Sequence, residues 1–172
     1  ALQRFKGDVV VARVLRELSE TEGKVDEAIS RQEQIVANSP PAAHPSEQQR
    51  LVDMLSRAGR CALDNGDFDR ARKIANKLQK ADPSGENGSL LAGDVHRAAN
   101  QPRKAVQLYG KVRSPAGLDR IAELLSEHPG VIEIRELLAW CPLQGILLVV
   151  ARELARAGEL DRAKRAARVA AE

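Results

Sequence analysis

Aromatic residues are scarce in this sequence, which has one Trp, one Tyr and two Phe among 172 residues. A core in a chain of this length must therefore be filled by Leu, Val, Ile and Ala, which is typical of helical bundles. Few side chains are left to stack on nucleic-acid bases, and the net charge of +3 is spread along the chain rather than gathered in basic runs. A nucleic-acid partner is therefore not expected.

Cysteine is almost absent as well. Cys61 and Cys141 are too few for a disulfide framework, and neither belongs to a CxxC pair or has a nearby His, so no zinc site is expected. Both are expected to be inert, half-buried thiols. The sequence indicates no cofactor.

Long apolar runs are missing too. The longest, residues 146–151, is far below the roughly 18 residues that a membrane span needs, and the first residues do not resemble a signal peptide. The cytoplasm is the favoured compartment. The opening at Ala1 indicates a trimmed fragment, whose parent protein could carry a signal or a membrane anchor.

The sequence contains a recurring pattern: a small residue, a helix-sized gap, Gly-Asp-Phe-Asp or a relative, and then Ala. Its clearest copy has Gly59, Gly66, Phe68, Ala71 and Pro83. Other copies contain Leu15, Gly23, Val25 and Ala28; Gly93, Asn100, Pro102 and Ala105; and Leu147, Gly158, Leu160 and Ala163. Self-similarity at about 34 residues is the mark of helix-turn-helix solenoids, whose units stack to bury their apolar faces.

We therefore expect a single all-α domain over residues 1–172, built from about five antiparallel helix pairs. The expected units are 8–42, 46–85, 86–115, 116–142 and 144–172, with a proline-rich insertion at 38–45.

Local signals refine the expected helices. Gly23 and Gly66 should supply left-handed turn residues, and Asp67 should cap the helix that follows it. Ser46 and Gln49 resemble a capping box, which predicts that a long helix starts at Ser46.

Two further expectations concern packing and pitch. Val10, Leu15 and Leu18 are expected to form an inward apolar stripe in the first helix. The helix after Pro102 should be short because Ser114-Pro115 follows closely, so the superhelix should change pitch near residues 113–117.

At the repeated residues the chain resembles the tetratricopeptide repeat (TPR) family. The resemblance implies a right-handed superhelix of helix pairs that serves protein-protein interaction. A narrower similarity, over residues 23–29, 47–51 and 69–71, is to the bacterial TPR regulator of lipopolysaccharide synthesis. That family also has a membrane anchor and a rubredoxin-like zinc module with CxxC pairs, and neither is present in this sequence.

The resemblance implies that the exposed face of each first helix lines a concave groove. The residues expected there are Arg13, Glu17, Asp53, Ser56, Arg60, Asp64, Leu90, Asp94, Arg97, Leu148, Arg152 and Arg156. Arginine recurs among them, and because its planar fork pairs with carboxylates, an acidic or C-terminal peptide is a plausible guest. The alternative is a solvated helix face of mixed charge.

The carboxylate clamp that some TPR proteins use on chaperone tails has Lys and Asn on successive first helices. Here Arg13 with Glu17, and Ser56 with Arg60, do not match it, which argues against a co-chaperone.

Catalysis is not indicated. His44 and His128 each precede a proline, and His96 is expected to be packed and hydrogen-bonded on the inner side of a helix. No nucleophile, phosphate loop or metal motif accompanies them. The sequence thus favours a noncatalytic scaffold for a protein or acidic peptide. The alternative is a self-assembly module that docks on another copy through its last helix or its insertion.

Overall fold

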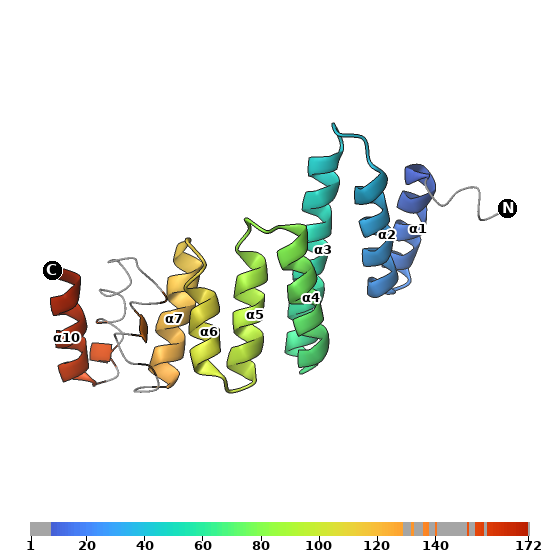
Figure 1. Cartoon of the computed structure of the whole chain (residues 1–172). Coiled ribbons are helices and arrows are strands. Elements are labelled where there is room, and N and C mark those ends of the chain that lie inside the picture. The colour runs from blue at the N-terminus through green and yellow to red at the C-terminus, as the bar shows by residue number, and fades with distance from the viewer. Residues whose placement is uncertain are drawn as a thin grey trace.

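The structure, a computed structural model, describes residues 8–128, 132, 136, 137, 140, 151, 154–156 and 158–171. Its helices follow one another in an elongated array, with the N-terminal pair at one end and the last helix at the other (Figure 1). No strand occurs in these ranges. The helices are α1 (Val9–Thr21), α2 (Val25–Asn38), α3 (His44–Asp64), α4 (Phe68–Ala81), α5 (Asn87–Ala98), α6 (Pro102–Tyr109), α7 (Pro115–Glu127) and α10 (Leu160–Ala171). The expected all-α repeat fold is confirmed.

The turns inside the first three helix pairs are built in the same way. Gly23, Gly66 and Asn100 each lie between the two helices of a pair and have φ angles of 72°, 74° and 54°. This left-handed backbone ends one helix and turns the chain into the next, and Gly and Asn adopt it at the least cost. The prediction for Gly23 and Gly66 is confirmed.

Capping was predicted correctly at one helix and wrongly at another. The carboxylate of Asp67 accepts a hydrogen bond from the backbone amide of Arg70 at 3.1 Å, as an N-cap should. The helix expected from Ser46 begins instead at His44, and the Ser46 hydroxyl donates to the carbonyl of Ala43. Pro45 explains the earlier start, because a proline is well tolerated in the first turn of a helix.

Aliphatic side chains and alanines fill the core, as the composition predicts. One cluster spans α2 to α5 around Leu55, Ala71 and Leu78, and a second begins at α6 with Ala105 and Tyr109. The helix after Pro102 is short, with 8 residues, as expected. The change of pitch after it remains a prediction.

A carboxylate connects the start of α5 to the residues that follow this short helix. Glu86, at the start of α5, accepts hydrogen bonds from the backbone amides of Arg113 and Ser114, just before α7, at 2.7 and 2.8 Å. Hydrogen bonding to Ser114 lowers the pKa of Glu86 below its ordinary value, against the opposing effect of burial. The beginnings of α5 and α7 are thereby tied together.

The expected inward stripe of α1 is wrong at Val10 and Leu18, whereas Leu15 is partly buried. Val10 and Leu18 are 66% and 53% exposed, and Val14 is exposed beside them. The buried face of α1 carries Arg16 and Ser19 instead. The apolar spacing alone could not show this, because a polar contact decides which face of α1 turns inward.

That contact is a buried polar network between the first three helices. Arg16, 1% exposed, donates to the side chain of Gln32 at 2.8 Å, and Gln32 donates to both the backbone and the side chain of Glu47 at 2.9 Å. Arg13 pairs with the same carboxylate at 2.5 Å. Burial raises the pKa of Glu47, but these hydrogen bonds and the two arginine charges outweigh it and hold that pKa below its ordinary value.

Several expectations fall on other parts of the chain. Cys141, much of the fourth unit's second helix and the opening of the last unit lie outside the described residues. Within the described ranges, no helix combines the length and the apolarity that crossing a bilayer requires.

Candidate functional site

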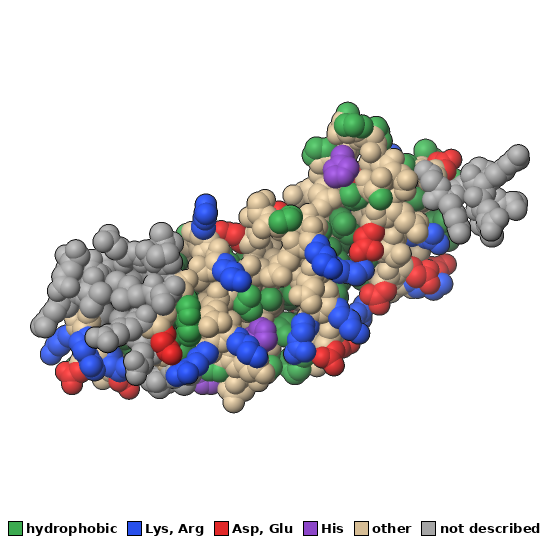
Figure 2. Space-filling model, viewed as in Figure 1, with side chains coloured by type: hydrophobic (Ala, Val, Ile, Leu, Met, Phe, Trp, Pro, Cys, Tyr) green, Lys and Arg blue, Asp and Glu red, His purple; other side chains and the backbone are tan. Residues whose placement is uncertain are grey.

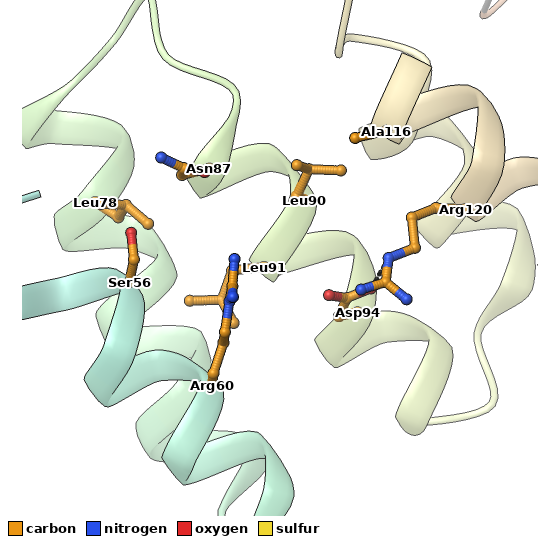
Figure 3. Close-up of a pocket in the computed structure, with 9 residues that line it drawn as sticks. All are labelled: Ser56, Arg60, Leu78, Asn87, Leu90, Leu91, Asp94, Ala116 and Arg120. Carbon is orange, nitrogen blue, oxygen red and sulfur yellow. Dashed lines mark ion pairs between the residues drawn. The ribbon is translucent and has the colours of Figure 1, made fainter. Parts of the chain in front are cut away.

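A pocket of about 160 Å³ lies where the first helices of three successive units come together. Ser56 and Arg60 come from α3, Leu90, Leu91 and Asp94 from α5, and Ala116 and Arg120 from α7 (Figure 3). Leu78 of α4 and Asn87 complete the lining. Four of the residues predicted to line a groove, namely Ser56, Arg60, Leu90 and Asp94, are therefore brought together.

Asp94 is held in place by two neighbours. The hydroxyl of the fully buried Tyr109 donates to Asp94 Oδ1 at 2.7 Å, and Nε of Arg120 lies 3.5 Å from the same oxygen. Burial, together with the Asp94 carboxylate, raises the pKa of Tyr109 well above its ordinary value, so the phenol stays protonated. Asp94 therefore already has its partners.

Arg97 is also engaged, one turn further along α5. It donates to Glu127 through Nε, at 3.0 Å, and through Nη2, and to Glu123 through Nη1 at 2.8 Å. The hydrogen bond to Arg97 is the main cause that lowers the pKa of Glu123. Both acids lie on α7, so Arg97 serves as a bridge between two units rather than as a free cation.

Arg60 and Ser56 differ from these residues. Arg60 is exposed and has no ion pair among the described residues. The hydroxyl of Ser56, one turn earlier in α3, is shielded from solvent and has no hydrogen-bond partner there. Their polar atoms are therefore available to a ligand at the pocket.

The remaining predicted groove residues lie elsewhere. Arg13 of α1 pairs with Glu47 of α3, and Glu17 pairs with Arg16 within α1. Asp53 accepts a hydrogen bond from Gln49, and Asp64 and Arg156 are exposed. Leu148 and Arg152 lie outside the described residues.

Sequence reasoning missed the contribution of α7 to the pocket. The predicted groove residues include none from the unit 116–142, although a first helix was expected there. The position of Ala116 and Arg120 in that helix is the sequence signal that points to the same groove as Ser56 and Arg60.

A second depression lies beside charged side chains that already form ion pairs. It measures about 450 Å³ and lies between α2 and α4, over Ile29 and Leu55. Two ion pairs connect these helices, Arg70–Asp26 at 3.0 Å and Lys77–Glu33 at 2.9 Å. On the face shown in Figure 2, Lys and Arg are likewise interspersed with other side chains rather than gathered in one patch.

Two expectations about Cys and His can be compared with the structure. Cys61 is exposed rather than half-buried, because it lies on α3 beside the open turn at Gly23. His96 is partly buried, and its Nδ1 lies 3.0 Å from the side-chain oxygen of Gln101, as expected for a hydrogen-bonded histidine. No cluster of potential metal ligands occurs in the ranges that the structure describes.

Comparison with known proteins finds structural likeness at low sequence identity. No protein-family model matches the sequence, and no curated protein matches it. Among solved structures, the chain is similar to one described as the crystal structure of MamA protein, with 13% identity and a TM-score of 0.40, over 94% of this chain and 89% of that one. Function must therefore be inferred from this chain's own residues.

Proposed function

We propose that this chain is a noncatalytic protein-interaction scaffold that binds an extended segment of a partner protein across α3, α5 and α7. The observation that supports this is the pocket lined by the first helices of three successive units. Repeat proteins present such aligned faces as continuous binding surfaces. A segment crossing all three helices would meet a free cation, apolar side chains and an ion pair in turn.

The paired arginines narrow the kind of partner. Arg97 and Arg120 are already paired with Glu123, Glu127 and Asp94. A strongly acidic segment would have to displace these pairs, so we propose a partner segment of mixed composition. The affinity of this segment for the scaffold would depend only weakly on salt concentration, because few charged groups without an ion-pair partner would come together in the complex.

Selection of peptides from a displayed library of linear segments, followed by mapping of the selected peptides, tests this function. Amide chemical shifts on α3, α5 and α7 should change upon binding. Ala116→Trp should fill the pocket from an exposed position and weaken binding at least roughly tenfold, which is about 1.4 kcal/mol. Ala37→Trp, also at an exposed alanine but on α2, is the matched control.

Equal affinity for Ala116→Trp and the parent chain, with both folded by circular dichroism, would show that recognition lies elsewhere. Shifts confined to α2 and α4 would place it on the depression between those helices.

A second candidate function is self-assembly through α1. Val10, Val14 and Leu18 are spaced four residues apart and are 66%, 60% and 53% exposed. In an antiparallel pair of α1 helices centred on Val14, Val10 would meet Leu18 of a second copy. The same alignment brings Glu17 within a turn of Arg13 of that copy, but both already have partners in their own chain, so the apolar contacts would carry this interface.

Sedimentation equilibrium over a concentration series tests this candidate. If the second copy docks on α1, the parent chain should dimerise and Val14→Asp should remain monomeric. A parent chain that is monomeric throughout, or a dimer that Val14→Asp leaves intact, would exclude this interface.

A further inference from the structure

One cation of the pocket lining has no ion pair. Two cations, Arg60 and Arg120, and one acid, Asp94, line the pocket. Arg120 pairs with Asp94 at 3.5 Å and with Glu123 at 3.4 Å, whereas Arg60 has no ion pair among the described residues. A carboxylate at Arg60 would therefore meet a cation that no acid of the described chain already holds.

Hydrogen-bond donors lie close to this cation. Ser56 precedes Arg60 by one helical turn and also lines the pocket, and its hydroxyl has no hydrogen-bond partner in the described part of the chain. Asn87 adds a side-chain amide and is also the first residue of α5, whose first-turn amides have no intrahelical acceptor. The side chain of Glu86, the N-cap residue, does not cap them. This corner of the pocket thus offers donors to an anion.

The volume of the pocket limits the size of the anion that can bind there. A volume of about 160 Å³ is below the roughly 300 Å³ at which pockets for small molecules and cofactors begin. Leu90, Leu91 and Ala116 supply the apolar part of the lining, with Leu91 beside Arg60 (Figure 3). A single short chain that ends in a charged group fits this combination, with its methylene groups against the leucines and its charge at Arg60.

We infer that the pocket binds one carboxylate of the partner segment, either of an acidic side chain or of a chain end, with Arg60 as its anchor. Ser56 and Asn87 provide hydrogen bonds beside it. This inference rests on the proposed function, because it assigns the chemistry by which the same surface recognises its partner. Arg60 holds the carboxylate through its planar fork, while Arg97 and Arg120 stay in their existing pairs.

Small carboxylates test the inference without knowledge of the partner. The probes are N-acetylglutamate N-methylamide for a side-chain carboxylate, N-acetylleucine for a chain end, and N-acetylglutamine N-methylamide as the uncharged match. The Nε–Hε signal of Arg60 is followed by NMR during titration. We expect at least one acid to saturate this signal and to bind about tenfold more tightly than the amide. The tighter of the two acids identifies the source of the carboxylate.

Two variants of α3 localise the effect. Arg60→Gln should weaken binding of the preferred acid roughly tenfold. Arg57→Gln makes the same change at an exposed arginine one turn earlier that does not line the pocket, and it should bind like the parent chain. The inference is overturned if neither acid saturates the signal, if the amide binds as tightly, or if both variants lose affinity equally.

These experiments distinguish a failure of the carboxylate site from a failure of the proposed scaffold function. If library-selected peptides lose affinity with Ala116→Trp but not with Arg60→Gln, the surface binds partners without a carboxylate anchor. If the acids bind at Arg60 while Ala116→Trp leaves the affinity of the selected peptides unchanged, the pocket binds carboxylates but the proposed function fails.

Discussion

Gly93 of α5 lies so close to Tyr109 of α6 that a Cβ atom on residue 93 would come 2.3 Å from Cε1 of the ring. The ring has little room to withdraw, because Tyr109 is fully buried and its hydroxyl is bound to Asp94 at 2.7 Å. Gly93→Ala should therefore lower the free energy of unfolding by about 1–3 kcal/mol through overpacking. Urea unfolding followed by circular dichroism measures this loss. At a helix position without such a contact, the change from Gly to Ala would instead raise the stability by about 1 kcal/mol through helix propensity.

A second variant shows whether the ring is the cause. In a Tyr109→Leu background, Gly93→Ala should cost less than in the parent chain, because the ring that it meets is gone. Equal costs in both backgrounds would mean that the two residues are not coupled.

Gly66 should resist substitution for a different reason. Nothing lies within 4 Å of the position that a Cβ atom would take, but its φ of 74° is a left-handed conformation. Gly66→Ala should lower the free energy of unfolding by about 1–2 kcal/mol. Gly66→Asn should cost less, since Asn100 adopts this conformation in the next unit. Thermal melts of the two variants check this order, and an Ala variant as stable as the Asn variant would contradict it.

The exposed apolar face of α1 should tolerate polar replacement in the monomer. Val14→Asp is expected to change the free energy of unfolding by no more than about 0.5 kcal/mol when measured at a concentration where the chain is monomeric. Ile35→Ala on α2, at a fully buried side chain, should cost about 2–5 kcal/mol by contrast. A large loss for Val14→Asp would show that α1 buries this face.

Acid should destabilise the fold through its paired glutamates. The pKa values of Glu47 and Glu123 lie below the 4.5 of an unconstrained glutamate. These carboxylates therefore contribute stability above about pH 4.5 and lose it as the pH falls through their folded-state pKa values, because unfolding then takes up protons. Urea unfolding between about pH 3 and 7 should show this slope, and Glu47→Gln should flatten it. Identical slopes in the variant and the parent chain would contradict the assignment to Glu47.

The sequence predicted backbone geometry well and side-chain pairing poorly. Gly23, Gly66 and Asp67 were placed correctly because turn and cap residues act through their own local conformation. The pairing of Arg97 with Glu123 and Glu127 was not foreseen, since it joins residues 26 and 30 positions apart. The orientation of α1 was missed for a similar reason, because Arg16 turns inward to reach Gln32 on another helix.

The contact of Glu86 with Arg113 and Ser114 has a consequence for local unfolding. This one carboxylate joins the start of α5 to the residues just before α7, so α6 cannot open at its end without breaking these two hydrogen bonds. We therefore expect α5, α6 and the start of α7 to open as one cooperative segment. The amide hydrogens of Arg113 and Ser114, although they lie in a turn, should exchange with solvent at a rate close to that of the helical amides of α5.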